Sequence, residues 1–249
     1  MSNAYYTSLF DFLDVNNIDY SIESNIVRFK DYPFSFFLVI QSETNTYIDF
    51  IKKREQEQDS FNSYLIFIWF DLWESKQNVV LSKIKHLFGL SIKIHARKTK
   101  VEIVNKLDCE HFFNKNHLNQ PVIGYKRIGL SINNELVALA SFAKRRKFRD
   151  DSYSAELLQF STLNNHHING GLSKLIKHFI KNHKVNSLMT YIDLDWSTGS
   201  KFKKIGFETQ SNRNFLNFKL DNQSNQRSVT NDENSTIFNT GSIKSLIYF

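Results

Sequence analysis

Two consecutive glycines, Gly170 and Gly171, open the segment of the sequence that is best suited to bind an anion. The run that follows them, to residue 183, has the apolar spacing of an amphipathic helix. Glycines let backbone amides approach a ligand closely, and the first turn of a helix carries unpaired N–H groups and a partial positive charge. We therefore expect a phosphate-binding turn here, with a structural turn before a packing helix as the alternative. The residues of the predicted turn are Ile168, Asn169, Gly170, Gly171, Leu172, Ser173 and Lys174.

Four polar side chains are candidates for acid–base chemistry near this turn. Ser173 falls in the first turn of the predicted helix, and Tyr191 and Asp193 share one face of a strand predicted at 187–193. His117 ends a short helix predicted at 109–117. A histidine and a carboxylate can act as a general base and the group that orients it. Helix capping is the alternative for Ser173 and Asp193, and a helix-end role is the alternative for His117.

A run of basic residues follows a predicted hairpin and contains one aromatic side chain, Phe148. Such a run suits the phosphate backbone of a nucleic acid, whereas a solvated turn is the alternative. The predicted nucleic-acid contacts are Lys144, Arg145, Arg146, Lys147 and Arg149.

The net charge of +7 is concentrated in the middle of the chain. Residues 99–220 carry 19 basic and 10 acidic side chains, an excess of +9, whereas residues 1–98 carry 11 basic and 12 acidic ones. This asymmetry favours a polyanionic partner or a phosphate-bearing ligand. The single cysteine, Cys109, excludes an internal disulfide and a cysteine-based zinc site and indicates a reducing cytoplasm. No apolar run is long enough to predict a membrane span, and no metal site is expected.

The elements that must position these residues fall into two regions. The second region begins with a strand at 91–106, and the predicted order to residue 220 is strand, helix, three strands, helix, strand, helix and a last strand at 214–219. Strands 127–132 and 136–142 form a hairpin. Residues 221–235 are rich in Asn, Ser and Gln and predict a disordered linker, and residues 236–249 predict a strand that closes the same domain. Residues 1–91 predict a smaller α/β domain with helices at 5–13, 48–58 and 78–87 and strands at 26–29, 34–41 and 64–69.

The order of elements in residues 92–220 resembles the GNAT fold of acyltransferases, and two motifs carry the resemblance. The run from His167 to Leu172 is similar to motif A of that superfamily, Q/R-x-x-G-x-G/A, which cradles the pyrophosphate of coenzyme A. His167 stands at the Q/R position, Gly170 at the glycine and Leu172 at the G/A position. The resemblance implies a mixed α/β fold with a central, mostly antiparallel sheet. It also implies that acetyl-CoA or another acyl-CoA is the cofactor.

The second motif is the segment 197–207, which is similar to the family's A-x-x-L-Y-x-K-x-G-F helix and ends in Gly206 and Phe207. In the family the tyrosine of this helix often protonates the leaving thiolate. Phe202 stands in its place, and a phenyl ring cannot donate a proton. The resemblance therefore implies an acyltransferase that takes this proton from another group, if it is catalytic.

Within the superfamily, the runs 155–160, 170–175 and 190–197 resemble Mom-type proteins, which modify adenine in DNA, and the C-terminal domain of phage homing-endonuclease-like proteins. The segment 238–244 resembles the same subgroup. The resemblance implies an acyl-CoA-dependent transferase that acts on DNA or another nucleic-acid-associated substrate. The alternative is a non-catalytic DNA-binding protein that derives from a homing-endonuclease-like mobile element. Leu172, Phe202 and Gln41 favour the alternative. The glycine turn and Asp193 favour the enzyme.

The N-terminal region, residues 1–91, resembles the Vsr or restriction-endonuclease-like domain of those proteins through segment 67–76. A nuclease of that type needs clustered carboxylates to hold Mg²⁺. Gln41 stands where an acid is expected, and Asp49 and Asp71 do not restore the set. We expect a nuclease-like fold without nuclease activity. The sequence does not indicate an oligomeric state.

Overall fold

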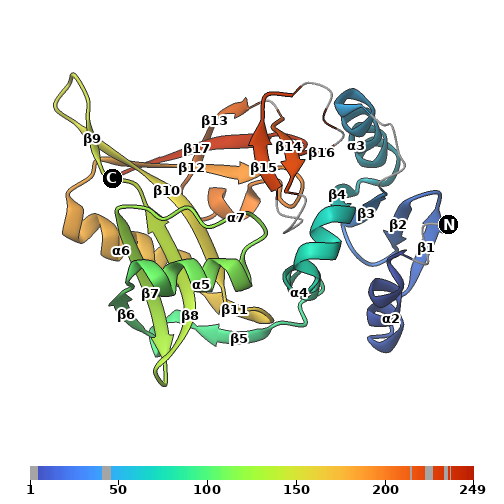
Figure 1. Ribbon diagram of the computed structural model, residues 1–249, viewed down its shortest axis with the longest axis horizontal. Coiled ribbons are helices and arrows are strands. Elements are labelled where there is room, and N and C mark those ends of the chain that lie inside the picture. The colour runs from blue at the N-terminus through green and yellow to red at the C-terminus, as the bar shows by residue number, and fades with distance from the viewer. Residues whose placement is uncertain (1–4, 41–45, 214, 222–226, 233–234, 236) are drawn as a thin grey trace. The chain divides into compact units, whose positions relative to one another are not determined.

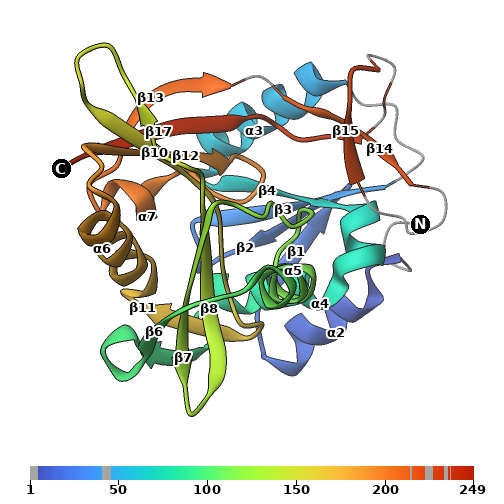
Figure 2. The same ribbon diagram turned by 60° about the vertical axis from the view of Figure 1, so that its left-hand side comes forward.

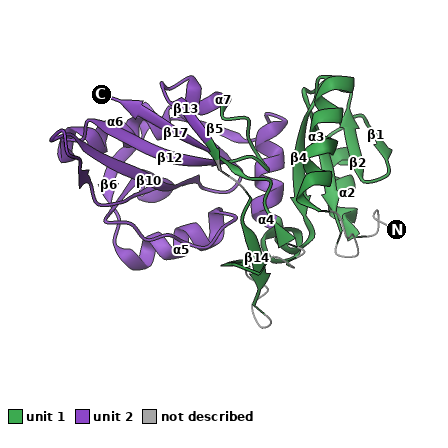
Figure 3. Cartoon of the chain, turned by 90° about the horizontal axis from the view of Figure 1, so that it is seen from above, with its two compact units in different colours: residues 1–77, 193–199, 212–242 green, residues 78–192, 200–211, 243–249 purple. Residues whose placement is uncertain are grey.

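A computed structural model describes residues 5–40, 46–213, 215–221, 227–232, 235 and 237–249 of the protein (Figure 1). The chain divides into two compact units, which Figure 3 colours separately. Unit 1 comprises residues 1–77, 193–199 and 212–242, and unit 2 comprises residues 78–192, 200–211 and 243–249. Each unit is therefore built from segments that are far apart in the sequence, so the boundaries differ from the predicted divisions at residues 91 and 220.

An eight-stranded sheet forms the centre of unit 2 among the described residues. Its strands are β6 (Lys100–Ile103), β7 (Lys126–Ile132), β8 (Glu135–Phe142), β10 (Tyr153–Thr162), β12 (Ser187–Asp193), β13 (Glu208–Arg213) and β17 (Ser242–Tyr248), with β9 (Arg146–Lys147) beside β10. The spatial order is β13-β17-β12-β10-β8-β7-β6. The pairs β6–β7, β7–β8 and β8–β10 are antiparallel, and β10–β12 is parallel. The predicted mixed α/β class with a mostly antiparallel central sheet is confirmed.

Two helices, α5 (Lys106–Asn116) and α6 (Gly171–His183), lie on opposite faces of this sheet (Figure 2). Side chains alternate along β8, so Ala138 and Ala140 belong to the core cluster under α6, whereas Leu139 belongs to the cluster under α5. Phe142 stacks on Phe179 of α6 with ring centroids 4.1 Å apart. The apolar face of α6 therefore fixes where the helix begins relative to the end of β10.

The predicted hairpin between β7 and β8 is present, and its two-residue turn is Asn133 and Asn134, with φ of 51° and 65°. Asparagine tolerates this left-handed conformation, which a tight hairpin turn requires. The continuous strand predicted at 91–106 is wrong. It is divided into β5 (Ile92–His95), a 3-10 turn η1 (Ala96–Lys98) and β6, and β5 pairs in parallel with β11 (His166–Asn169) in a separate sheet.

Unit 1 contains a four-stranded sheet in the order β1-β2-β3-β4, in which only β3–β4 is parallel. Its elements are α2 (Thr7–Val15), β1 (Tyr20–Glu23), β2 (Ile26–Phe29), β3 (Phe34–Val39), α3 (Tyr47–Phe61) and β4 (Tyr64–Trp69). Helix α4 (Phe70–Leu87) follows β4 and contains one non-helical residue, Lys76, near the unit boundary. None of the described helices is long and apolar enough to cross a lipid bilayer.

A small sheet of unit 1 changes the interpretation of the C-terminal region. It joins β14 (Asn217–Leu220), β15 (Arg227–Thr230) and β16 (Ile237–Phe238). The strand predicted at 214–219 therefore belongs to unit 1 and not to the larger sheet. The predicted linker at 221–235 contains strand β15, and its residues 222–226 and 233–234 lie outside the described part of the chain. Strand β17 takes the place of the predicted closing strand, between β12 and β13.

Candidate functional site

The first turn of α6 has the features of an anion site. Gly170 precedes the helix as its N-cap residue with φ of 76°, a left-handed conformation that favours glycine. No side chain caps this terminus, and no acidic residue lies in its first turn. Gly170 is exposed, and a Cβ there would lie 3.9 Å from its nearest neighbour, Ala96 Cβ. The N–H groups of the first turn have no intrahelical acceptor and can therefore bind an anion.

Gly171 serves packing and not backbone freedom. A Cβ at this position would lie 3.0 Å from Cβ and Cγ2 of Ile168, which is closer than side chains normally approach. Ile168 is 3% exposed and belongs to the core cluster beneath α6. Leu172, which stands at the G/A position of motif A, also packs against this cluster. The two apolar side chains of the predicted turn thus anchor it on the core.

The polar side chains of the turn contact the protein itself. The ammonium of Lys174 donates to the carbonyl oxygens of Ala96 at 2.8 Å and Thr99 at 2.5 Å. Asn169 forms a side-chain hydrogen bond with His167. Ser173 is the third residue of the helix, so the alternative role of N-cap falls to Gly170. Backbone amides, and not the Lys174 ammonium, are therefore the anion-binding groups that the turn offers.

Strand β10, which precedes β11 and the turn in the chain, has irregular pairing on both of its edges. Strands β10 and β12 pair in parallel from Ser154–Ser187 to Leu157–Thr190, and within the described residues their pairing ends there. On the other edge of β10 the register with β8 shifts between Leu157 and Gln159, as at a β-bulge. Bulges interrupt a ladder locally and are frequent beside active sites. Strand edges that do not pair with each other can accept an extended ligand that carries amide groups.

Gln159, at this irregularity, is a residue that the sequence analysis missed. Its side chain is 6% exposed, accepts the Val122 N–H at 2.7 Å and donates to the Gln120 carbonyl at 2.7 Å. Its amide nitrogen also lies 3.4 Å from Nδ1 of His117. Gln159 therefore ties the loop after α5, including His117, to the interrupted part of β10. A single glutamine in an apolar strand was the only sequence signal.

The four predicted catalytic residues come from three elements, α5, α6 and β12. His117 is the C-cap residue of α5, and its Nδ1 accepts the Asn119 N–H at 3.1 Å. Tyr191 and Asp193 are half-buried on one face of β12. Asp193 Oδ1 accepts the Asp195 N–H at 2.9 Å, so this carboxylate shapes the turn after the strand. Ser173, His117 and Tyr191 belong to unit 2, and Asp193 belongs to unit 1.

Phe202, on α7 (Ser200–Lys203), is a packing residue. Its ring contacts Phe207 edge-on at 5.5 Å, and its carbonyl accepts the Phe207 N–H at 3.1 Å. Gly206 between them has φ of 99°, and a Cβ there would lie 3.1 Å from Ile247 Cδ1. The Gly-Phe ending of the second motif is therefore explained by packing, since Gly206 lies against Ile247 of β17.

The basic run forms a hairpin in which β9 pairs with the start of β10. Arg145 donates to the His183 carbonyl at 2.9 Å and lies 4.2 Å from the centre of the Tyr153 ring, so it stabilises the C-terminus of α6. Lys147 forms an exposed ion pair with Asp151 at 2.5 Å. The aromatic side chain at the tip, Phe148, is 55% exposed. The exposed basic side chains beside it are Lys144, Arg146 and Arg149.

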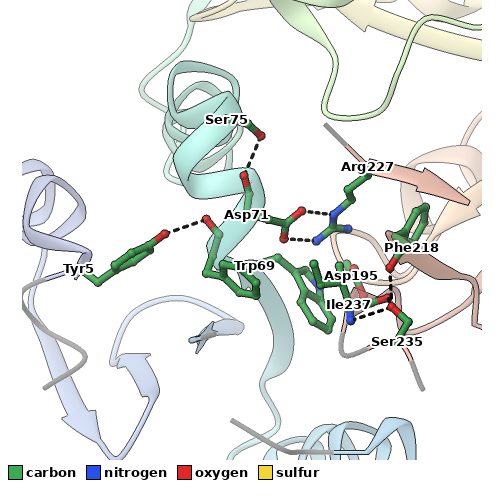
Figure 4. A network of polar contacts seen from close by, with 10 residues as sticks. Tyr5, Trp69, Asp71, Ser75, Asp195, Phe218, Arg227, Ser235 and Ile237 are labelled. Atoms are coloured by element: carbon green, nitrogen blue, oxygen red, sulfur yellow. Dashed lines mark hydrogen bonds and ion pairs between the residues drawn. The ribbon is translucent and has the colours of Figure 1, made fainter. Parts of the chain in front are cut away.

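The two carboxylates considered for a nuclease centre in unit 1 have structural partners. Asp49 caps α3 together with Thr46 in a reciprocal capping box. Asp71 is fully buried and forms a bidentate ion pair with Arg227 of β15 (Figure 4). Nearby, Asp195 accepts hydrogen bonds from the Trp69 indole at 2.9 Å and the Thr240 N–H at 2.8 Å. Burial raises the pKa of Asp195 above its usual range, although these hydrogen bonds and the nearby arginines oppose the shift.

Comparison with known proteins finds no matching family model and no matching curated protein. Among solved structures, an Arabidopsis thaliana protein in complex with a CoA-containing bisubstrate analogue has a TM-score of 0.43 at 11% identity, covering 61% of this chain and 99% of its own. An Elizabethkingia anophelis GNAT family acetyltransferase with acetyl-CoA bound has a TM-score of 0.40 at 14% identity, with coverage of 61% and 99%. A Bacillus subtilis acetyltransferase in complex with CoA has a TM-score of 0.39 at 12% identity, with coverage of 61% and 99%.

Because these TM-scores are below 0.5, the fold class rests on the order of elements in unit 2. That order is β6, α5, β7, β8, β10, α6, β12, α7, β13, to which β5, β9, β11 and β17 are added. It agrees with the predicted order, except that β13 is the last strand in place of the strand predicted at 214–219, and α6 begins at the predicted glycine turn. Unit 2 therefore has a mixed α/β fold whose order of elements resembles that of the GNAT fold.

Proposed function

We propose that unit 2 is an acyl-CoA-dependent transferase that binds the donor's pyrophosphate on the first turn of α6. The observation that carries the proposal is the uncapped, glycine-led terminus of α6, the helix between β10 and β12 in the chain, together with the end of the described β10–β12 pairing at Leu157 and Thr190. The helix amides suit a pyrophosphate because several donors and the helix dipole act on it together. The region beyond Leu157 and Thr190, where the described pairing of β10 with β12 ends, suits the pantetheine arm, which is extended and carries two amides.

In the proposed reaction, an amine nitrogen of the acceptor attacks the thioester carbonyl. A C–N bond forms, the C–S bond breaks, the amine gives up one proton and the departing thiolate gains one. Holding amine and thioester together supplies much of the rate in such a reaction. We propose Ser173, Tyr191 and Asp193 as residues near the acyl group, with Asp193 as the acceptor of the amine's proton.

His117 is the proposed source of the thiolate's proton. Its Nδ1 accepts a backbone N–H from Asn119, so the neutral ring carries its own proton on Nε2. A ring in that tautomer can donate where Phe202 cannot. Gln159 would act as a positioning residue because it contacts both the loop and the His117 ring.

We further propose that the acceptor is DNA or another nucleic-acid-associated substrate, as in Mom-type base modification. The excess of +9 in residues 99–220 and the exposed Phe148 hairpin support this acceptor. Lys144, Arg146 and Arg149 would contact phosphates, whereas Arg145 and Lys147 would support the hairpin through their own contacts. A reducing, cytoplasmic setting belongs to the same proposal, since Cys109 is a buried free thiol.

Binding of acetyl-CoA to the full chain tests the donor. A ligand at about 100 times its Kd stabilises the folded state by about 2.7 kcal/mol, which raises the Tm of a protein of this size by about 5 °C or more. No shift with millimolar acetyl-CoA would contradict the proposal. Mass spectrometry of nucleosides from cells that express the protein then identifies the modified base. Cells expressing the Ser173→Asp variant provide the matched control.

A second candidate is a non-catalytic DNA-binding protein, which the packing role of Phe202 favours because the family's proton donor is replaced. This candidate requires DNA retention that weakens steeply as salt is raised, since phosphate contacts release counterions. Salt-dependent DNA binding together with no acetyl-CoA binding would support it over the transferase.

A further inference from the structure

A cluster of basic side chains in unit 2 lies outside the amide turn of α6. The rings of His86 on α4 and His167 on β11 have centroids 4.5 Å apart and planes inclined by 35°. The Lys201 ammonium on α7 lies 2.5 Å from Nε2 of His86. Since an ammonium can only donate, Nε2 accepts this bond and His86 is neutral. Three elements from distant parts of the sequence thus place three basic groups in direct contact.

Backbone structure holds this cluster in place. Strand β11 pairs with β5, and Lys93 of β5 is directly opposite His167 in the register. The hydroxyl of Ser82, on α4, accepts the Asn165 N–H at 2.7 Å, which ties the helix to the residue before β11. The His86 and His167 rings are therefore held in contact by elements that are joined by hydrogen bonds of their own.

The electrostatics of the cluster are one-sided. The pKa of His86 is lowered to about 4 by burial and then by Lys201, His167, Lys83 and Lys93. Burial, Lys201 and Lys93 also lower the pKa of His167, and its hydrogen bond to the Asn169 side chain opposes this shift. Desolvation and Lys204 lower the pKa of Lys201. Within the described residues, every charged group that acts on these three side chains is basic.

Burial and the surrounding basic groups disfavour the charged form of His86, and an anion bound beside the ring would favour that form. We propose that His86, His167 and Lys201 form a binding site for the terminal phosphate of a phosphate monoester, and that binding adds one proton to His86 from solvent. Protonation turns Nε2 from an acceptor of the Lys201 bond into a donor, so both side chains can then face the phosphate.

The charge of the ligand favours a monoester over a nucleic-acid backbone. A monoester carries nearly two negative charges and three terminal oxygens at neutral pH, which match three basic groups. A backbone diester carries one charge on two oxygens. The 3′-phosphate of CoA is one source of such a group and a free nucleotide is another, so the inference rests on the proposed function only for the first source.

Calorimetric titration of the full chain tests the site without requiring acyl transfer. The probes are adenosine 3′,5′-bisphosphate and inorganic sulfate. The charge of sulfate does not change between pH 5.5 and 7.5. Titration in two buffers of different ionisation enthalpy measures proton uptake. We expect proton uptake with both probes, and an affinity for sulfate that rises about tenfold from pH 7.5 to pH 5.5 as His86 takes up its proton. Binding without proton uptake would overturn the inference.

Variants distinguish binding at this site from a general effect of the protein's net charge. We expect Lys201→Gln to weaken bisphosphate binding about tenfold, whereas Lys203→Gln removes the same charge from the same short helix and should weaken it less than about twofold. Equal losses would overturn the inference. We expect His86→Gln to abolish proton uptake. In case that variant does not fold, the ring resonances of His86 in the unmodified protein give the same information, and a pKa that stays near 4 in saturating sulfate would refute the site.

Two further controls distinguish sources. If acetyl-CoA binds normally to Lys201→Gln while the bisphosphate does not, the monoester site stands and CoA is not its ligand. If the protein takes up a proton when it binds duplex DNA but not when it binds the bisphosphate, the monoester assignment is wrong. Loss of acetyl-CoA binding in Ser173→Asp with unchanged sulfate binding would show that the α6 turn and this cluster are separate sites.

Discussion

The substitution Ser173→Asp has opposite expected effects on stability and on ligand binding. Ser173 is half-buried at the third position of α6, where the first turn has neither a cap nor an acidic residue. An aspartate there would interact favourably with the unpaired amides and the helix dipole. The free energy of unfolding of the variant should therefore be about 0.3–1 kcal/mol higher than that of the unmodified protein. Few substitutions at a binding site are expected to stabilise the protein that they inactivate.

The same carboxylate should repel a bound pyrophosphate. At about 6 Å and an effective dielectric of about 20–80, one pair of like charges costs about 0.7–2.8 kcal/mol, so acetyl-CoA affinity should fall by about threefold to a hundredfold. Ser173→Asn has a similar shape without the charge and serves as the control. Calorimetric titration gives the affinities and urea unfolding gives the stabilities. Equal acetyl-CoA affinity in the Asp and Asn variants would refute a pyrophosphate site on this turn.

Three further outcomes follow from buried groups. Arg227→Met leaves the buried Asp71 carboxylate unpaired and should lower the unfolding free energy in urea by about 3–5 kcal/mol, a loss that Asp71→Leu in the same chain should largely restore. Below about pH 6.5 His86 is protonated in the unfolded state, whereas in the folded state its pKa is about 4 and the ring stays neutral. The free energy of unfolding should therefore fall by about 1–3 kcal/mol from pH 6.5 to pH 4, and His86→Gln should remove this part of the pH dependence. Burial raises the pKa of Cys109 to about 11, so iodoacetamide should label it only in denaturant, and labelling of the folded protein would contradict the packing of α5.

Local signals made part of the fold predictable from the sequence. The Asn133–Asn134 turn and the glycine start of α6 both depend on residues that tolerate a positive φ, so their positions could be read directly. The element order of unit 2 followed from such signals and from hydrophobic periodicity. Boundaries shifted where tertiary packing decided them, as at α4, which begins eight residues before the predicted 78.

Long-range pairing was not predictable in this way. Arg227 lies 156 residues from Asp71, and nothing local to 221–235 indicates that a strand of this polar segment covers a buried carboxylate. The pairing of β5 with β11 likewise divides a segment whose alternation alone predicts one strand. These contacts depend on which segments meet in space, and that is set by the whole chain.

The candidate site shows the same division. The sequence indicated the amide turn correctly in position, but the Lys174 ammonium is used by the η1 turn, because two backbone carbonyls there need a donor. The contact between His86 and Lys201 joins residues 115 apart and has no sequence signature. The residue types indicated which chemistry a segment could perform. The hydrogen bonds and packing contacts of the fold decide which of its side chains can contact a ligand.

A crystal structure of the full chain with acetyl-CoA tests the central claim most directly. We predict pyrophosphate oxygens within hydrogen-bonding distance of the amides of Gly171, Leu172 and Ser173, and a pantetheine arm along β10 beyond Leu157. Acetyl-CoA bound elsewhere, or a chain that binds none at millimolar concentration, would contradict the account.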